Sequence, residues 1–531
     1  MKMIYGVKDR PPAGKLILFA LQQLLAILAA TIAVPKIIGN GMQPGAALFG
    51  AGVGTIVYLL FTKFKSPVFL GSSFAFLGSM AAAFAGGISM SLGFLGLLIG
   101  TAFAGLVYVI IAVVVKFAGV KWIDKIMPAV VIGPVVAIIG LSLAGNAIGD
   151  LLSGGATYEV TEQVAEIVDG IAQSKFVPVT YTYANMFIAL LCGLVTLAVT
   201  MVCSVYGKKT LKMIPFIIGI LAGYAVAAIF TGFSYIKGAE CLRVIDFSIF
   251  SKIGEPKSWY PEFAFLNAFN IGKGGYGVVK DGVFRAFSGK EIGAYIGSIA
   301  VAYIPVAFVV FAEHLADHKN ISSIIEKDLL RDPGLHRTLL GDGVGSIAGA
   351  FFGGCPNTTY GESVGCVAIS QNASVITILI TACMAILSAF LAPFTLFLSS
   401  IPPCVMGGVC IALYGFIAVS GLKMIQKEDL NDHRNLFTVS VVLIAGVGGL
   451  VLTIGKVTIT AVACALILGI LTNLLLNIGA KKGKAQPAAE GAVEAPAAME
   501  DSAGTEAQPP AETDEAAATS DEAQASEEVT E

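Results

Sequence analysis

Long apolar runs alternate with short polar stretches along almost the whole chain. About fourteen apolar segments follow one another, and they run near residues 15–39, 44–62, 67–86, 92–116, 127–148, 183–205, 212–232, 292–316, 338–353, 357–370, 373–399, 403–422, 436–453 and 457–479. A membrane-spanning helix needs about 20 predominantly apolar residues, and the segments around 338–370 are shorter than that. The pattern predicts an all-α polytopic membrane protein with fourteen transmembrane segments.

A polar stretch opens the tenth segment. Residues 354–363 read GCPNTTYGES, which is too polar and too rich in Pro and Gly for a helix that faces lipid. Backbone that is not helical at membrane depth is tolerated only where protein buries it or where it lines a cavity. The acidic residue of this stretch, Glu362, is costly in a membrane unless it is functional or paired. A broken helix of this kind indicates the substrate site of a transporter.

One set of helix-breaking residues occurs twice with the same spacing. In the fifth segment, a glycine follows a proline after five residues, and a second glycine follows after seven more. The twelfth segment repeats this spacing; the residues are Pro128, Gly133 and Gly140 in the fifth segment and Pro403, Gly408 and Gly415 in the twelfth. Segments seven apart enter the membrane in opposite directions, so the match predicts two inverted repeats of seven segments, with coincidence in a Gly-rich chain as the alternative. The repeat pairs the tenth segment with the third, where 67–76 also opens with Pro, Gly and hydroxyl residues. Two such half-helices would direct free N–H groups at one cavity and bind carbonyl oxygens of a small ligand.

The eighth segment carries two carboxylates at depth. Glu313 and Asp317 are four residues apart, so they lie on one face of a helix. Two carboxylates on one face repel each other and are poorly solvated near the middle of a membrane, which is the property of a proton acceptor coupled to transport. The alternative for Asp317, and the favoured interpretation of His318, is an ordinary polar residue at the cytoplasmic rim.

Other polar residues in apolar segments have both structural and functional interpretations. A satisfied packing role is favoured for His314. Asp342 is either a further intramembrane carboxylate that takes part in proton coupling or a helix cap at the start of the ninth segment. Gln22 and Gln23 in the first segment need hydrogen-bond partners and are compatible with a purely structural role.

Composition supports a membrane protein and excludes several other classes. Hydrophobic residues make up 56% of the chain and charged residues 13%, with a mean hydropathy of +0.82, whereas soluble domains have about 25% charged residues. The first apolar run is long enough to span, so no cleavable signal is expected. The Cys and His residues form no metal-spaced set, and no nucleophile–base pair stands out, so neither a metal, a cofactor, a nucleic-acid partner nor an enzyme is predicted.

Basic residues predict the orientation in the membrane. If residues 1–14 are cytoplasmic, most Lys and Arg fall in the inner loops, and the short outer loops hold little besides Lys36, Lys175 and Lys456. Residues 233–290 contain Lys and Arg throughout and are expected to form a long extracellular loop, a kind that escapes this rule. Both termini are then cytoplasmic.

The C-terminal end differs in composition from the rest. After Lys484 the chain has 13 acidic and no basic residues, which leaves 33 basic against 23 acidic residues, or a net charge of +10, in the remainder. Residues 481–531 are rich in Ala, Glu, Pro and Thr and cannot bury a core, so a disordered, acidic cytoplasmic tail is predicted. An inert solvated tail is the default interpretation, and a partner-binding arm is the alternative.

Three motifs resemble the nucleobase/ascorbate transporter family, and within it the bacterial uracil permeases. They are Ala312-Glu313-His314, the loop from Lys327 to Arg337 (KDLLRDPGLHR) and Pro356 to Glu362 (PNTTYGE). Over about residues 10–480, the resemblance implies a core domain of segments 1–4 and 8–11 (15–116 and 292–399) and a gate domain of segments 5–7 and 12–14 (127–232 and 403–479). It also implies short antiparallel strands in segments 3 and 10, a homodimer in the lipid membrane, and substrate carried together with protons, with the proton gradient in place of any cofactor.

The resemblance also implies a substrate site. Glu313 and Glu362 would hydrogen-bond the pyrimidine ring, because a lactam N–H suits a carboxylate acceptor, and the proton would reside on Glu313 or Asp317. The other residues implied are Phe74 and Gly361, through their backbone N–H groups, and Ala30, Tyr360 and Tyr414 as lining.

The chain departs from the uracil permeases at two positions. Asp317 stands where uracil permeases often have His, and Ser363 stands where the family usually has Asn. Glu362 favours uracil, whereas Asp317 resembles the purine members, so xanthine or another purine nucleobase is the alternative substrate. Two carboxylates disfavour an anion transporter, and a channel would lack proton coupling.

Overall fold

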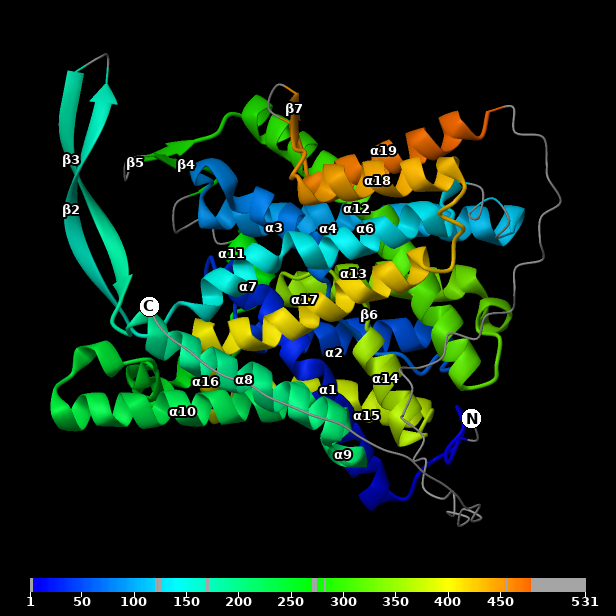
Figure 1. The fold of residues 1–531 in the computed structure, drawn as a ribbon, viewed down its shortest axis with the longest axis horizontal. Helices are drawn as coiled ribbons and strands as arrows, with labels where there is room; N and C mark the ends of the chain where they lie inside the picture. The colour runs from blue at the N-terminus through cyan, green and yellow to red at the C-terminus, as the bar shows by residue number, and fades with distance from the viewer. Residues whose placement is uncertain are drawn as a thin grey trace, which may run out of the picture. The chain divides into compact units, whose positions relative to one another are not determined.

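The computed structural model describes residues 3–119, 122, 126–168, 171–269, 275–280, 283–454 and 457–478. These residues belong to one unit, Met1–Val493. The tail predicted for 481–531 lies outside the described residues. The described part is mostly helical, as the sequence predicts (Figure 1).

Eight helical stretches among the described residues are long and apolar enough to cross a membrane. They are α1 (Ala13–Ile38), α2 (Pro44–Phe61), α4 (Met90–Ala118), α6 with α7 (Ala129–Ser142 and Ala144–Leu151), α8 (Met186–Tyr206), α10 (Pro215–Lys237), α12 (Gly289–Ile324) and α17 (Pro403–Ile425). A ninth candidate is bent by 84° between α15 (Val375–Ser388) and α16 (Ala392–Ser400). The remaining helices in the apolar segments are α3 (Leu77–Phe84), α13 (Leu335–Gly353), α14 (Gly361–Ser370), α18 (His433–Val447) and α19 (Ala461–Leu476). These helices confirm a multi-pass membrane protein.

Local sequence signals explain several helix ends. Proline occupies the first helical position of α2, α10 and α17, where its missing N–H costs no hydrogen bond. Ser288 and Glu291 form a capping box that begins α12. α1 ends at Ile38 and is followed by Gly39, whose φ of 63° suits glycine.

Two short strands join the broken segments. β1 (Leu70–Ser72) pairs antiparallel with β6 (Asn357–Thr359), and Gly71 lies opposite Thr358. The pairing continues past the strand ends, where the Ser73 N–H donates to the Pro356 carbonyl at 2.9 Å. Because all six strand residues are buried, these hydrogen bonds satisfy backbone groups that water cannot reach. The helices that follow the two strands therefore begin next to each other.

Small residues allow two pairs of helices to approach closely. In α2 and α13, a Cβ on Gly50 would lie 2.3 Å from the Gly349 carbonyl oxygen, and one on Gly54 would lie 2.7 Å from that of Gly345. The numbers rise along one helix as they fall along the other, so the two helices are antiparallel. In α6 and α17, a Cβ on Gly140 would lie 2.3 Å from the Tyr414 carbonyl oxygen. Close backbone packing through small residues is typical of membrane helices.

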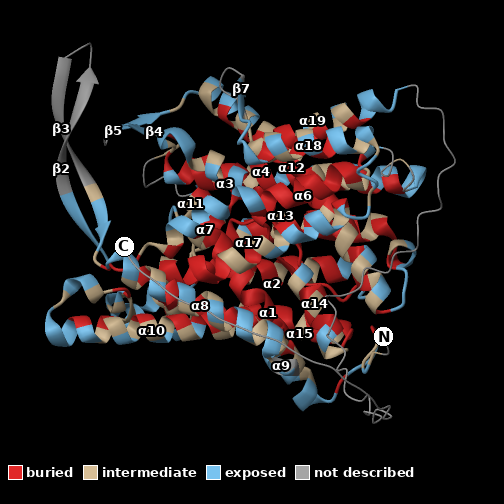
Figure 2. Cartoon of the chain, viewed as in Figure 1, coloured by how far each residue is buried: buried red, intermediate tan, exposed pale blue. Residues whose placement is uncertain are grey.

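The helices form two groups. In the first, α2 packs on α13 and α15, α4 packs on α12 and α13, and α1 packs on α2 and α15. In the second, α17 packs on α6, α7 and α8, α8 packs on α10, and α18 packs on α6 and α19. Buried residues follow α2, α6, α13 and α17, whereas the outward faces of α8 and α10 are exposed (Figure 2). Exposed apolar residues there, such as Val202 and Ile229, suit contact with lipid.

Several elements were not predicted from the sequence. β2 (Thr157–Val168) and β3 (Ile171–Thr182) form a hairpin between α7 and α8. The stretch 233–290, expected to be a loop, contains several short elements and the end of α10. They are the 3-10 turns η3 to η5 (Glu240–Leu242, Phe247–Gly254 and Pro256–Trp259), α11 (Ala264–Phe269), and the paired strands β4 (Gly277–Lys280) and β5 (Val283–Ala286). A helix of five residues, α9 (Lys209–Met213), separates α8 from α10, η7 (Leu330–Gly334) precedes α13, and β7 (Leu452–Ile454) pairs with β8 (Val457–Ile459) before α19.

Candidate functional site

A cavity of about 330 Å³ lies between the two groups of helices. The first group and the two broken segments contribute six of the residues singled out in the sequence: Phe74, Glu313, Asp317, Tyr360, Gly361 and Glu362. The second group contributes an apolar wall that includes Val136 of α6 and Leu413 and Phe416 of α17. Residues of α9 and the start of α10, such as Lys212, also line it. The cavity therefore joins a polar surface to an apolar one, as small-molecule sites generally do.

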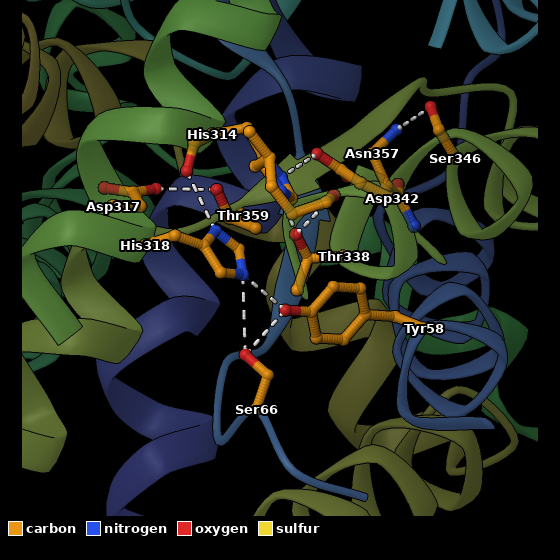
Figure 3. A network of polar contacts seen from close by, with 11 residues as sticks. Tyr58, Ser66, His314, Asp317, His318, Thr338, Asp342, Ser346, Asn357 and Thr359 are labelled. Carbon is orange, nitrogen blue, oxygen red and sulfur yellow. Dashed lines mark hydrogen bonds and ion pairs between the residues drawn. The ribbon is translucent and has the colours of Figure 1, made fainter. Parts of the chain in front are cut away.

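The carboxylates of the cavity come from two helices. Glu313 and Asp317 lie one turn apart on α12, and Glu362 lies in the first turn of α14. The N-terminal end of a helix favours negative charge, which stabilises a carboxylate at Glu362. The Thr359 hydroxyl of β6 donates to Asp317 Oδ2 at 2.7 Å, so this hydrogen bond connects the strand to α12 (Figure 3).

Tyr360 is held in place by the neighbouring strand. Its hydroxyl donates to the Ser72 carbonyl at 2.8 Å. Its ring lies directly over Gly71, where a Cβ would meet two ring carbons at 2.3 Å. Phe74, two residues after the end of β1, packs edge-on against Tyr414 with the ring centroids 5.6 Å apart. Two aromatic residues thus form fixed parts of the cavity wall.

A polar link that the sequence did not predict lies behind Glu362. The Gln23 side chain of α1 donates to the Ser363 hydroxyl at 2.5 Å, and the Phe69 N–H donates to the same hydroxyl oxygen at 3.1 Å. All three residues are buried. The link connects α1, the chain entering β1, and the first turn of α14. The sequence predicts that Gln23 needs a hydrogen-bond partner, but its position alone does not identify that partner.

Ser73 is a second lining residue that the sequence did not single out. It lies between β1 and Phe74 and lines the cavity. It is 1% exposed, and its hydroxyl oxygen has no hydrogen-bond partner among the described residues. A buried hydroxyl without a partner is costly, so a ligand in this cavity would find an available hydrogen-bonding group here.

A buried polar network lies on another face of α12 (Figure 3). His314 Nδ1 lies 2.7 Å from Asp342 Oδ2, and His314 Nε2 lies 3.0 Å from the Thr338 hydroxyl. His318 Nε2 lies 2.7 Å from the Tyr58 hydroxyl. The two imidazole rings stack with centroids 4.0 Å apart. Neither histidine lines the cavity, so these contacts fit α12 against α2 and α13.

The network corrects two interpretations. His318 was expected at the rim of the membrane, but it is fully buried because α12 continues to Ile324. The alternative of a helix cap for Asp342 is wrong, because α13 begins at Leu335 and Asp342 lies two turns inside it. The packing role favoured for His314 agrees with its two partners. Asp342 itself faces His314 and does not line the cavity.

Two of the expected lining residues lie behind the wall. Ala30 is 1% exposed within α1, and Ala26, about one turn earlier, lines the cavity instead. Tyr414 is 3% exposed and touches Phe74 from behind, while Leu413 and Phe416 of the same helix face the cavity. The rotation of α1 and α17 about their axes therefore decides which of their residues reach the cavity. Among the described residues, no group of three or more His, Cys, Asp or Glu is placed to hold a metal ion.

Comparisons with known proteins identify relatives of the whole chain. A model of a permease family matches residues 14–169 and 160–455. The uracil permease of Bacillus caldolyticus is 36% identical over 481 residues, which cover 90% of this chain and 95% of that protein. The uracil permease of Bacillus subtilis is 35% identical over the same coverage. That of Escherichia coli K12 is 32% identical over 476 residues, covering 89% of this chain and 94% of the relative.

A solved structure shares the fold. The transmembrane domain of a cyanobacterium bicarbonate transporter, BicA, superposes with a TM-score of 0.53 at 14% identity and covers 88% of this chain and 97% of that domain. At this identity the likeness concerns the fold alone.

Proposed function

Because this chain belongs to the nucleobase/ascorbate transporter family, we propose that it is a proton-coupled symporter that imports uracil across the cytoplasmic membrane by alternating access. The observation that carries the proposal is the single cavity that Glu313 and Glu362 line together with the starts of two half-helices. Such half-helices are a common substrate site of transporters.

The cavity suits the donor and acceptor pattern of a pyrimidine lactam. Carboxylates at Glu313 and Glu362 accept hydrogen bonds from ring N–H groups, and such charge-assisted bonds are strong. Phe74 begins the 3-10 turn η1 (Phe74–Phe76) that leads into α3, and Gly361 begins α14, so their backbone N–H groups are free to donate to ring carbonyl oxygens. The apolar wall of α6 and α17 covers the ring faces. Each part of the ligand then has a partner.

Glu313 and Asp317 are the candidates for the coupling proton. Both line the cavity, so a proton bound there neutralises charge next to the substrate. Asp317 already accepts a hydrogen bond from Thr359, whereas the Glu313 carboxylate accepts none from the described residues. We therefore propose that Glu313 carries the coupling proton. Asp342 is bound to His314 and is an indirect candidate.

Packing supports fourteen spans in two inverted repeats. Segments seven apart in the chain meet as antiparallel pairs, namely α2 with α13, β1 with β6, and α6 with α17. The two repeats also make equivalent contacts: α4 packs on α13, and their counterparts in the other repeat, α15 and α2, pack on each other. We assign the first group of helices to a core domain and the second to a gate domain that moves against it. We also propose cytoplasmic termini and a homodimer, as the family resemblance implies.

A purine nucleobase such as xanthine is the alternative substrate, and Asp317 is the residue that favours it. An anion is disfavoured, although BicA shares the fold, because three carboxylates line the cavity.

The test is uptake of labelled uracil into proteoliposomes with an imposed proton gradient. Glu313→Gln and Glu362→Ala should each abolish uptake without loss of folded protein. Glu255→Gln changes an exposed carboxylate outside the cavity and should leave uptake unchanged. Normal uptake in both site variants would refute the site. Competition by xanthine, hypoxanthine and thymine would separate the substrates, and uptake that survives collapse of the gradient would exclude symport.

A further inference from the structure

Lys36 is a charged residue that the proposed transport site does not use. It lies in the last turn of α1 and is half-buried. Its ammonium donates to the Ile401 carbonyl at 2.6 Å and lies 3.4 Å from the Ser399 carbonyl. These carbonyls belong to the C-terminal end of α16, where the helix dipole favours a cation. Asp150 of α7 lines the same cavity as Lys36 and is opposite to it in charge.

The partners of Lys36 belong to both groups of helices. Ser399 lies in the last turn of α16, and Ile401 lies in the short junction that leads into α17. Asp150 belongs to α7, which packs on α17. Lys36 therefore connects α1, in the proposed core, with the start of the proposed gate. A movement of the gate against the core would change the distances from Lys36 to Ile401 and Asp150.

A cavity of about 460 Å³ surrounds Lys36 and Asp150, separate from the substrate cavity. A third cavity of about 450 Å³ shares Ile37 and Asn40 with it and shares Phe74 with the substrate cavity. The three cavities thus follow one another along the boundary between the two groups. The substrate cavity reaches α9, whereas the cavity of Lys36 reaches η4 through Ile249. If they were joined, the three cavities would form a path across this boundary, which is now interrupted at Phe74 and again at Ile37 and Asn40.

We propose that Lys36 is a latch that keeps the half of the transport path remote from α9 closed. The latch rests on the proposed transport function, and it adds a residue to that function which does not touch the substrate. While the ammonium is bound to the α16–α17 junction and attracted by Asp150, the gate is held against the end of α1. Release of these contacts lets α17 move away and joins the cavity of Lys36 to the third cavity.

The chain contains a native reporter for each half of the path. Cys410 of α17 lines the cavity of Lys36 and is 1% exposed. Cys366 of α14 lines the substrate cavity and is 4% exposed. Opening of the remote half should expose Cys410, and the accompanying closure on the α9 side should protect Cys366. The two thiols therefore respond in opposite directions to one conformational change, whereas loosening of the fold would expose both.

The experiment measures maleimide labelling of the purified protein, with each cysteine resolved by peptide mass spectrometry. In Lys36→Met, Cys410 should label about tenfold faster or more, which corresponds to about 1.4 kcal/mol, and Cys366 should label more slowly. Lys36→Arg keeps the cation and should resemble the wild type. Asp150→Asn removes only the attraction and should change both rates in the same directions, but less.

Three outcomes would overturn the latch: unchanged rates in folded Lys36→Met, faster labelling of both cysteines, or the full effect in Lys36→Arg. If Lys36→Met does not fold, Lys36→Gln and Asp150→Asn are judged by the same criteria. Labelling needs no substrate, so failure of the latch and failure of uracil transport are separate results. A shifted labelling pattern in a protein that carries no uracil would refute the proposed substrate and leave the latch in place.

Discussion

Gly71 provides a test of the strand pair that shapes the cavity. It lies in β1 opposite Thr358, and its φ is not in the left-handed region, so an alanine fits the backbone. A Cβ at this position would nevertheless lie 2.3 Å from two carbons of the Tyr360 ring and 2.8 Å from its hydroxyl. We predict that Gly71→Ala displaces Tyr360 and weakens nucleobase binding.

The size of the effect follows from the contact distances. Ordinary van der Waals contacts begin at 3.4 Å. The Tyr360 ring would lie 2.3 Å from the added Cβ, so ring and Cβ must separate by about 1.1 Å. Overpacking of this kind typically costs about 1–3 kcal/mol. The movement also breaks the hydrogen bond from the Tyr360 hydroxyl to the Ser72 carbonyl, worth about 0.5–1.5 kcal/mol net. If the binding free energy loses about 1–3 kcal/mol, the dissociation constant rises by roughly 5- to 150-fold.

Equilibrium binding of labelled uracil to the purified protein is the assay, and thermal unfolding reports on the fold. Gly78→Ala is the matched control in the same segment, because its Cβ would meet only Thr460, at 3.7 Å. Gly78 lies inside α3, so alanine there should preserve or slightly increase stability. A Gly71→Ala protein that is folded and binds within twofold of the wild type would contradict this account of the cavity.

Two further substitutions test other parts of the site and the fold. Thr359→Val removes the hydroxyl that donates to Asp317. Because hydrogen bonds to charged groups are worth about 1.5–3 kcal/mol, the initial rate of uptake should fall roughly tenfold or more. Thr359→Ser keeps the hydroxyl and should retain the rate, so equal rates for both variants would exclude a role for this hydrogen bond. Gly54→Ala would place a Cβ 2.5 Å from Asn357 Nδ2 and should lower the melting temperature of the purified protein, while Gly297→Ala, with no atom within 4 Å, should not.

Much of the fold could be predicted because local pattern encodes it. Apolar length predicted the helices, and the boundaries of α1, α2 and α17 agree with the predicted segments to within a few residues. Polar residues in apolar surroundings identified Glu313, Asp317 and Glu362, which the structure brings into one cavity. A charged group in a membrane is expensive wherever it lies, so its presence in a sequence already points to a site.

Side-chain direction could not be predicted as well. Ala30 and Tyr414 were expected to face the ligand, but rotation of α1 and α17 brings Ala26 and Leu413 to the cavity instead. These helices are apolar almost all round, so the sequence offers no polar stripe from which to read their orientation. The β2–β3 hairpin was also missed.

Sequence alone therefore determined which segments enter the membrane and which residues are too polar to be there without a reason. Only the tertiary structure decided the partners of those residues. Gln23 meets Ser363 across 340 residues of chain, and Lys36 meets Ile401 across 365. Periodicity along a helix describes one face of one element, whereas a hydrogen bond between elements depends on how both are rotated and placed. For this reason the polar groups were visible in the sequence, while the contacts that satisfy them appeared only in three dimensions.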